Sequence, residues 1–181
     1  MHLVVFCGIL GSVFRGRKGV IIMGIRIDVP GKQVYQIDTI VFDLNGTLAV
    51  DGRLRSNTRE LLKNLAGIVD VHVLTADTHH SALHIQEALG DIINVHVLAG
   101  ENTVESKRTF IKEAGSQQTA AVGNGVNDIG MLEEAVLSIA VLEAEGCSAE
   151  ILLKADIVVR NTDDALELLL NTNRIVATLR R

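Results

Sequence analysis

Aromatic residues and cysteines are scarce in this chain, and each scarcity excludes a class of protein. Phe, Tyr and Trp together supply 3% of the 181 residues, whereas hydrophobic residues of all kinds supply 48%. A folded core must therefore be built from Val, Ile, Leu and Ala. The two cysteines, Cys7 and Cys147, are too few for a disulfide framework and are typical of a reducing compartment. We therefore expect a cytoplasmic protein with an aliphatic core.

Dense positive charge and long hydrophobic runs are missing as well. The net charge is −5, which argues against nucleic acid or an anionic membrane as the main partner. Residues 1–14 are apolar, but they are too few to span a bilayer, and basic residues follow them instead of preceding them as in a signal peptide. We expect no stable membrane insertion. Residues 1–22 are then an extra strand, a tail or an over-extended gene start, because Met23 begins a sensible chain.

Linkers, repeats and low-complexity segments are absent, so residues 23–181 are expected to form a single domain. Apolar alternation around Pro30-Gly31 predicts a hairpin over residues 22–37. After it, short Val- and Ile-rich runs alternate with segments of helical period, which predicts an α/β fold with a mainly parallel sheet covered on both faces. The expected strands are 39–44, 69–75, 92–98, 119–122, 137–141 and 155–159. The expected helices are 58–66, 81–89, 104–114, 128–135, 148–154 and 163–179.

Polar residues stand where three of the expected strands end, and ligands of parallel sheets bind beyond the carboxyl ends of the strands. Asp43 ends the first strand and Thr75 the second, and Asp128 closes the GNGVND stretch that follows the fourth. Lys107 lies on the helix before that fourth strand. Phosphoryl transfer needs such a set, which comprises a nucleophile, a hydroxyl donor, a cation and a hard metal ligand.

Each of these residues also has an ordinary structural interpretation. Asp43 before Asn-Gly is typical of a turn, Thr75 would serve as a helix N-cap, and Lys107 would be a solvated helix residue. GNGVND would be an ordinary glycine-rich turn between a strand and a helix. Their occurrence in order, at strand ends of one predicted sheet, nevertheless favours a catalytic site.

Four stretches of the chain together match a known family. VFDLNGTL, LTAD and AAVGNGVNDIGML, together with Lys107, resemble the four motifs of the haloacid dehalogenase superfamily of phosphohydrolases. Within it, the resemblance is closest to the phosphorylation domain of P-type ATPases, as in the soluble P-type-ATPase-like phosphatases, and covers residues 38–180. It implies a Rossmann-like three-layer sandwich of sheet order 3-2-1-4-5 and a Mg²⁺-dependent phosphatase.

Carried over residue by residue, the resemblance implies a role for each motif. Asp43 would attack phosphorus and form an aspartyl-phosphate, and the other members of the catalytic group would be Asn45, Thr75 and Lys107. The phosphate contacts would come from Leu44, Asn45, Gly46, Thr47, Thr75, Ala76, Lys107 and Asn127. The ligands of Mg²⁺ would be Asp43, the main-chain carbonyl of Asn45, Asn124 and Asp128.

Two positions depart from the phosphatase pattern of that superfamily. Asn45 stands where most of these phosphatases have an Asp that protonates the leaving group, and an amide cannot exchange a proton near neutral pH. A general acid or base is worth about 10²–10⁴-fold in rate, so we expect slow turnover or a long-lived phosphoenzyme. Asn124 replaces the main metal-binding Asp, so we expect weak Mg²⁺ binding that tightens with phosphate. The alternative is a catalytically impaired, phosphate-responsive regulatory or binding module.

No cap domain fits between the motifs, because a strand and a helix already fill each interval. The stretch 48–56 is the expected flap, in which Arg53 or Arg55 either meets the substrate or is solvated. The open site suits a phosphorylated small molecule or macromolecule, or closure by a second copy of the chain. Three further residues, expected to be surface histidines and not a zinc site, are His79, His80 and His84.

Overall fold

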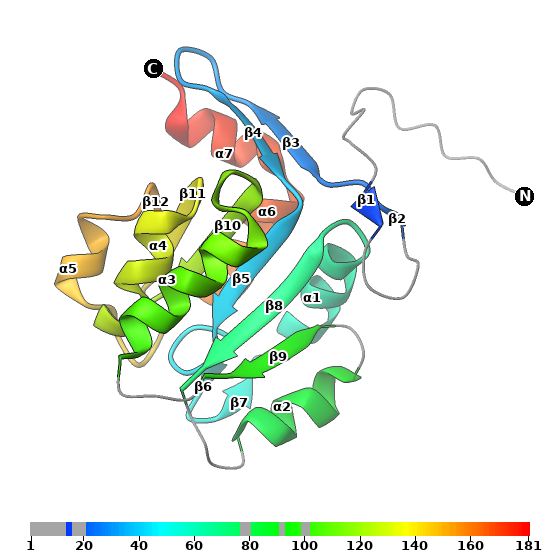
Figure 1. The fold of residues 1–181 in the computed structure, drawn as a ribbon, viewed down its shortest axis with the longest axis vertical. Coiled ribbons are helices and arrows are strands. Elements are labelled where there is room, and N and C mark those ends of the chain that lie inside the picture. Colours follow the sequence, from blue (N-terminus) through cyan, green and yellow to red (C-terminus); the bar gives the residue numbers. More distant parts are fainter. Residues whose placement is uncertain (1–13, 16–20, 77–80, 91–92, 99–101) are drawn as a thin grey trace, which may run out of the picture.

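A six-stranded parallel sheet forms the centre of the fold. The computed structural model describes residues 14–15, 21–76, 81–90, 93–98 and 102–181, and Figure 1 shows the sheet in the middle of the molecule. The strand order is β12-β11-β10-β5-β8-β9, and all neighbouring pairs are parallel. The strands are β5 (Thr39–Asp43), β8 (Asp70–Thr75), β9 (Asn94–Val97), β10 (Thr119–Gly123), β11 (Leu137–Val141) and β12 (Ile157–Val159). This order confirms the expected 3-2-1-4-5 arrangement and adds β12 beside the fifth strand.

Helices cover both faces of this sheet and make the expected three-layer sandwich. One face packs against α1 (Thr58–Ala66), α2 (Ser81–Leu89), α6 (Thr162–Leu170) and α7 (Thr172–Leu179). The other face packs against α3 (Thr103–Ala114), α4 (Ile129–Glu134) and α5 (Ala149–Leu152). Within the described part of the chain, no helix combines the length and the apolar character that crossing a membrane requires.

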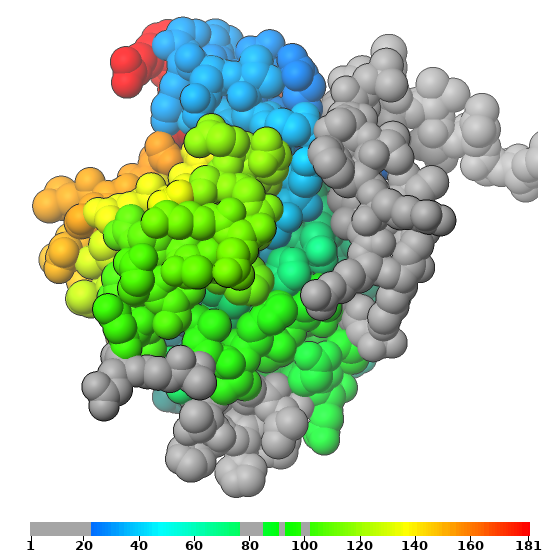
Figure 2. Space-filling view, in the orientation of Figure 1, coloured from blue at the N-terminus to red at the C-terminus, as the bar shows by residue number. Residues whose placement is uncertain are grey.

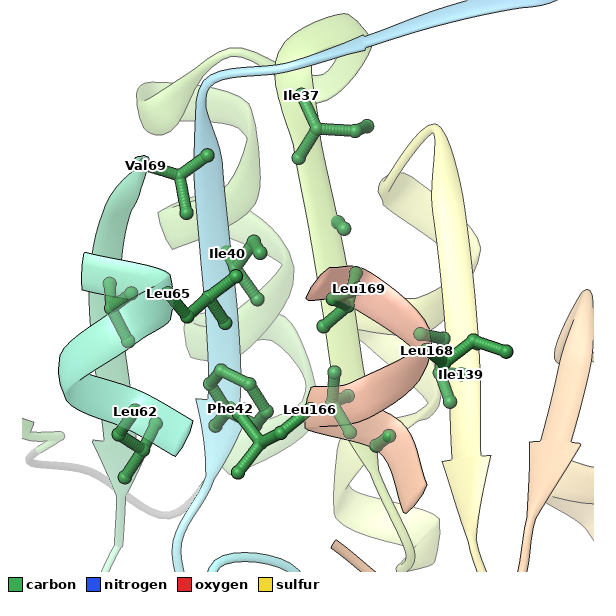
Figure 3. Packing of buried hydrophobic residues seen from close by; sticks show 14 of the residues in the cluster. Ile37, Ile40, Phe42, Leu62, Leu65, Val69, Ile139, Leu166, Leu168 and Leu169 are labelled. Carbon is green, nitrogen blue, oxygen red and sulfur yellow. The ribbon is translucent and has the colours of Figure 1, made fainter. Parts of the chain in front are cut away.

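The core is aliphatic, as the scarcity of aromatic residues requires. Alternate residues of β5 reach opposite layers, so Ile40 and Phe42 join one buried cluster while Val41 joins the other. Figure 3 shows Leu65 of α1 and Leu166 of α6 in the same apolar layer as Ile40 and Phe42. Because both faces of the strand are buried, its sequence is continuously apolar until the strand reaches the edge of the sheet.

An antiparallel hairpin lies outside the central sheet, where the alternation around Pro30-Gly31 predicts it. It consists of β3 (Ile25–Asp28) and β4 (Val34–Ile37), and Gly31 adopts a φ of +76° in the turn. The hairpin forms the top of the molecule in Figure 2. A short antiparallel pair precedes it, formed by β1 (Phe14–Arg15) and β2 (Ile21–Ile22). The rest of the expected tail, residues 1–13 and 16–20, lies outside the described residues.

A second small hairpin follows β5 and is the flap expected over residues 48–56. Its strands, β6 (Ala49–Val50) and β7 (Arg53–Leu54), are joined by Asp51 and Gly52, whose φ values are +50° and +71°. Two consecutive positive φ values are typical of the tight turn between hairpin strands, and Asp-Gly is a favoured sequence for it. Only this hairpin and α1 separate β5 from β8, so no cap domain is inserted there.

The prediction of one helix over residues 163–179 is wrong, because the chain forms two. Asn171 separates α6 from α7 and has non-helical angles, with φ −119° and ψ +79°. Its amide bonds back to the Glu167 carbonyl, which ends α6, and the second helix brings Ile175 into the core. The elements β9, β12 and α5 are also shorter than expected, with four, three and four residues.

A glycine lets α4 approach α3 closely, and this approach fixes the helix that carries Lys107. A Cβ atom added at Gly130 would lie 2.2 Å from the Val104 carbonyl oxygen and 3.0 Å from the Val104 Cγ1 atom. No side chain fits at such a distance, so the backbone of α4 lies directly against α3. Lys107 follows Val104 by about one helical turn.

We expect Gly130→Ala to lower the free energy of unfolding by about 2 kcal/mol, because the added methyl group forces α4 away from α3. The matched control is Gly67→Ala, since Gly67 has φ −73° and its added Cβ would meet nothing nearer than 3.3 Å. That control should change the free energy of unfolding by less than about 1 kcal/mol. Urea unfolding of the three proteins measures these values, and equal stability of wild type and Gly130→Ala would contradict the close packing of the two helices.

Candidate active site

Three charged side chains meet at the carboxyl edge of the sheet. Asp43 ends β5, Asp128 follows β10, and Lys107 reaches both from α3. The Lys107 Nζ atom lies 2.5 Å from Asp43 Oδ1 and 2.5 Å from Asp128 Oδ1. The structure thus brings together three of the four residues on which the sequence hypothesis depends. The interpretation of Lys107 as a solvated helix residue is wrong, because its side chain is 0% exposed.

Helix α3 directs Lys107 inward because this residue shares a helix face with Ile111. Ile111 is buried in the apolar cluster between α3, α4 and the sheet. The helix begins after Asn102, whose side chain accepts a hydrogen bond from the Glu105 amide and thereby caps the first turn. The methylene groups of Lys107 can pack in the protein interior while its ammonium group reaches the two carboxylates.

Asp128 is held by its own loop as well as by Lys107. Its Oδ2 atom accepts hydrogen bonds of 2.9 Å from the amides of Asn124 and Gly125, and the residue is fully buried. Gly123 makes this arrangement possible, because a Cβ atom there would lie 2.7 Å from the Asp128 side chain. Both carboxylate oxygens of Asp128 are engaged by N–H donors, so this side chain orients Lys107 and the loop.

The stretch after Asp43 folds into a tight loop, residues 44–49, which we call the phosphate loop. The amides of Thr47 and Ala49 donate to the Leu44 carbonyl, and the Gly46 amide donates to the Ala49 carbonyl. The Gly46 amide, expected to contact phosphate, is therefore used within the loop in this structure. The expected turn after the strand is confirmed.

The side chains of the phosphate loop point to different places. Asn45 is exposed, whereas Thr47 is fully buried. Gly46 has φ +76°, and a Cβ atom there would lie 2.4 Å from Asn124 Nδ2, so this position requires glycine. The phosphate loop thus leaves Asn45 open to solvent and presses its glycine against the loop that holds Asp128.

Asn124 connects three segments through its side-chain amide. Its Oδ1 atom accepts a hydrogen bond of 3.2 Å from the Thr47 hydroxyl, and its Nδ2 atom donates one of 3.0 Å to the Gly146 carbonyl. An Asp at this position would have no N–H to donate to Gly146. The amide is therefore suited to holding these loops together.

The residues at this edge form a donor set that fits Mg²⁺ only in part. Asp43, the main-chain carbonyl of Asn45 and the amide oxygen of Asn124 are hard oxygen ligands of the type that Mg²⁺ prefers. Among the described residues, no three His, Cys, Asp or Glu side chains gather into a metal-binding group. Asp128, the fourth expected ligand, already has both oxygens engaged. The Asn45 carbonyl and the Asn124 amide would add no negative charge to the coordination of a bound ion.

Burial dominates the electrostatics of the site. Loss of hydration, together with repulsion from Asp128, raises the pKa of Asp43 to about 7 even though Lys107 acts in the opposite direction. Burial also disfavours the ammonium form of Lys107, but the attraction of Asp128 and Asp43 outweighs it and raises the pKa of this lysine. Lys107 is therefore a permanent cation, while Asp43 needs added positive charge nearby to stay ionised near neutral pH.

The remaining expected phosphate contacts lie around this centre. Thr75 ends β8 beside β5, is 1% exposed, and accepts a hydrogen bond of 2.8 Å from the Leu98 amide through its carbonyl. Ala76 is exposed, and Asn127 is half-buried with its Oδ1 atom close to Gly125. The alternative role of Thr75 as a helix cap involves residues 77–80, which lie outside the described residues.

The structure describes the two flap arginines but not the side chains of the three expected surface histidines. Arg55 forms an ion pair of 3.1 Å with Glu143, while its side chain remains 45% exposed, as the interpretation of a solvated residue expects. Arg53 is exposed on β7. The expected surface histidines His79 and His80, and the side chain of His84, lie outside the described residues.

Sequence reasoning missed two polar groups, one after β11 and one within the sheet. Glu143 follows β11 and binds residues of two other segments, but no motif marks it. The second group is a histidine pair, in which His72 Nδ1 lies 2.9 Å from His96 Nε2 and His72 Nε2 lies 3.3 Å from Asp70 Oδ2. The two histidines lie on neighbouring strands, so only the strand register could have revealed the pair.

Comparisons with known proteins point to one family. Two family models, both described as haloacid dehalogenase-like hydrolase, match residues 49–135 and 109–166. An uncharacterized protein of Methanocaldococcus jannaschii, MJ0073, is 46% identical over 69 residues, which are 38% of this chain and 74% of that protein. The copper-exporting P-type ATPase B of Archaeoglobus fulgidus is 31% identical over 150 residues, or 78% of this chain. The chain spans only 21% of the length of that ATPase.

A solved structure shares the fold. It is 3-deoxy-D-manno-octulosonate 8-phosphate phosphatase from Moraxella catarrhalis, in complex with a magnesium ion, a phosphate ion and KDO. The TM-score is 0.60 at 18% identity, and the match covers 80% of this chain and 94% of the other. At this identity the similarity shows the fold alone, and the fold agrees with the helix-covered parallel sheet described above.

The raised pKa of Asp43 predicts a pH-dependent stability. Between about 3.9, the ordinary pKa of Asp, and the value of about 7 in the fold, the folded state binds the additional proton. The stability that this proton contributes is present below the lower value and is lost as the pH rises through the higher one. In EDTA, wild type should lose about 2 kcal/mol of unfolding free energy relative to Asp43→Asn between about pH 5 and pH 8.

Urea unfolding of both proteins at the two pH values measures this difference. Titrating groups that are remote from Asp43 are common to the two proteins, so their contributions cancel in the comparison. A difference that stays constant with pH would show that Asp43 has an ordinary pKa in the fold.

Proposed function

The chain belongs to the haloacid dehalogenase superfamily of hydrolases, and on this basis we propose that it hydrolyses or transfers phosphoryl groups through an aspartyl-phosphate on Asp43. The observation that carries the proposal is the buried contact of Lys107 with Asp43 and Asp128 at the carboxyl edge of a parallel sheet. A carboxylate nucleophile, a fixed cation and a loop at the end of the strand are what aspartyl phosphoryl transfer requires.

In the proposed reaction, a carboxylate oxygen of Asp43 attacks the phosphorus atom of the donor. A bond forms between that oxygen and phosphorus while the bond from phosphorus to the leaving group breaks. Lys107 neutralises charge on Asp43 and on the phosphoryl oxygens, and Thr75 with the main chain of the phosphate loop holds those oxygens in place. Mg²⁺, bound by Asp43, the Asn45 carbonyl and Asn124, would supply further positive charge there. Asp128 keeps Lys107 in position.

We expect removal of the phosphoryl group from Asp43 to be slow. Hydrolysis of the acyl-phosphate requires a base that activates water, and Asn45 provides an amide at the position of the usual carboxylate. Asp128 is engaged by Lys107 and by two amides, so it does not replace that base. The phosphoenzyme should therefore persist much longer than in a phosphatase that has an Asp there.

A phosphate-responsive regulatory or binding module is the second candidate function. The observation that favours it is the pair of amides, Asn45 and Asn124, at positions where the family has carboxylates. In this case the site would bind phosphate without catalysing turnover.

The open site defines the class of substrate that we propose. The flap is a hairpin with a two-residue turn, so the donor can be a phosphorylated small molecule or a phosphorylated macromolecule. A second copy of the chain would be one way to close the site.

The two cysteines and the acidic net charge lead us to propose a cytoplasmic protein that does not act on nucleic acid.

Incubation with Mg²⁺ and acetyl phosphate should label Asp43 with an acyl-phosphate that survives acid and is released by hydroxylamine. Release of phosphate should be slow, and Asn45→Asp should accelerate it by about tenfold or more, because a general acid or base is restored. Intact-protein mass and a phosphate assay measure the two steps. Asp43→Asn is the control and should abolish both. A wild-type protein with neither label nor phosphate release would reject the enzyme and leave the binding module.

Asn124→Asp should tighten Mg²⁺ binding in the absence of phosphate by about tenfold or more, because a full negative charge joins Asp43. Calorimetric titration of metal-free protein with MgCl₂ measures the dissociation constants. Asn57→Asp adds the same charge at an exposed position before α1 and should leave the affinity within about twofold. If Asn124→Asp bound Mg²⁺ no better than wild type, residue 124 would not be a ligand position.

A further inference from the structure

Glu143 is a buried carboxylate for which the proposed chemistry has no use. It follows β11, and its side chain is only 4% exposed. The carboxylate accepts hydrogen bonds from Arg55 Nη1 at 3.1 and 3.3 Å, from the Thr162 amide at 2.9 Å and from the Ala144 amide at 3.2 Å. A buried negative charge is tolerated only where donors of this kind compensate its lost hydration. The flap, α6 and the loop after β11 thus converge on one side chain.

Two of these donors connect Glu143 to the segments that follow Asp43 in the chain. Arg55 stands directly after β7, at the base of the flap. Thr162 is the first residue of α6, and its hydroxyl donates a hydrogen bond to the Thr47 carbonyl in the phosphate loop. Glu143 is therefore connected to the flap through Arg55 and to the phosphate loop through Thr162.

The residues after Glu143 continue these connections. Glu145 Oε1 accepts a hydrogen bond of 2.8 Å from the Asp51 amide in the turn of the flap. The Gly146 carbonyl accepts one of 3.0 Å from Asn124 Nδ2, and the Ser148 amide donates one of 2.9 Å to the Asn124 carbonyl. The segment 143–148 thus touches the flap at its base and at its tip, and also touches the loop that carries Asp128.

The backbone of Glu143 supports a role for its side chain. Its φ of +33° lies in the left-handed region, which residues other than glycine rarely adopt. Such strain persists where the surrounding contacts over-determine the conformation, and it is concentrated at functional sites. A glycine would relieve the strain but would lose the carboxylate that binds Arg55 and Thr162.

We propose that Glu143 is a positioning residue of the phosphoryl-transfer site, which fixes the flap through Arg55 and the phosphate loop through Thr162. The flap, fixed through Arg55, would orient the phosphoryl donor. The bond from Thr162 would hold the main chain of the phosphate loop next to Asp43. The kinetic consequences rest on the proposed function, whereas the effect on the flap and the loop does not depend on it.

Hydrogen exchange followed by mass spectrometry tests the positioning directly. Glu143→Gln keeps the shape of the side chain and removes its charge, so amides in residues 44–56 should exchange about tenfold faster. Arg55→Gln should accelerate exchange to the same extent in residues 50–56. In those residues the double variant should exchange less than about twofold faster than Glu143→Gln alone, because both substitutions remove the same interaction. The matched control is Arg53→Gln, since Arg53 is exposed on the same hairpin and its side chain has no hydrogen bond to the described residues.

Thr162→Val tests the connection to the phosphate loop separately from the connection to the flap. It keeps the Thr162 amide that binds Glu143 and removes only the hydroxyl that donates to the Thr47 carbonyl. Exchange should then rise in residues 44–49 and remain at the wild-type rate in residues 50–56. Faster exchange in both residues 44–49 and residues 50–56 would contradict the proposal that Glu143 fixes the phosphate loop and the flap through different residues.

Labelling of Asp43 by acetyl phosphate with Mg²⁺ tests the kinetic consequences. Arg55→Gln should raise KM for the donor about fivefold with a nearly unchanged rate at saturation, whereas Thr162→Val should lower the rate at saturation. Glu143→Gln should do both. Glu167→Gln is the control, because it removes a surface carboxylate that pairs with Arg174 at 2.8 Å and should alter neither value. A loss of active protein would also lower the rate at saturation with an unchanged KM, so Thr162→Val must in addition keep the wild-type exchange rate outside residues 44–49.

The outcomes separate this inference from the proposed function. If wild type is not labelled, the proposed function fails, and hydrogen exchange still tests whether Glu143 positions the flap and the loop. If Glu143→Gln and Arg55→Gln exchange at the wild-type rate in residues 44–56, the inference is overturned, whatever the labelling shows. If labelling succeeds but these variants keep the wild-type KM and rate, the flap is positioned without consequence for the reaction, and the inference is also overturned.

Discussion

The contact of one buried ammonium group with two buried carboxylates is the interaction on which the rest of this site depends. Lys107 Nζ lies 2.5 Å from both Asp43 and Asp128, and all three side chains are almost completely removed from water. Removing Lys107 would leave two negative charges in the interior without adequate compensation. The cluster also carries one negative charge more than positive when all three groups are ionised. Burial is the main reason the pKa of Asp43 rises, and repulsion from Asp128 adds to it. A cation or a proton would relieve both effects.

The scaffold supports this cluster through close approaches of backbone at positions without a side chain. Gly130 lets α4 lie against α3, Gly123 leaves room for Asp128, and Gly46 lets the phosphate loop touch Asn124. In each place a Cβ atom would overlap a neighbour. Around these contacts, side-chain amides and one buried carboxylate hold the loops to one another. Asn124 and Glu143 both act in this way, since each bonds to segments that are far apart in the chain. The loops around Asp43 are thus held in place by the protein's own polar groups.

The sequence could predict those parts of the structure that depend on residues close together in the chain. The Val- and Ile-rich runs identified the strands because a strand that is buried on both faces is continuously apolar. Asp43 and Asp128 could be singled out because each stands at the end of such a run. The final helix was mispredicted because its apolar period continues through Asn171, and only the turn toward the hairpin shows that the chain breaks there. Glu143 was missed because nothing near it in the sequence distinguishes it from a solvated loop residue.

The sequence by itself determined the α/β class, the aliphatic core and the identity of the residues gathered at the carboxyl edge of the sheet. It did so because helical and strand periods, and the position of a polar residue after an apolar run, are local properties. Only the tertiary structure decided which of those residues touch. It engaged both oxygens of Asp128, buried Lys107, paired Arg55 with Glu143 across 88 positions and joined Thr162 to Thr47 across 115. Such contacts depend on the order of strands in the sheet and on the loops between them. No local pattern in the chain specifies the distance between two side chains that only folding brings together.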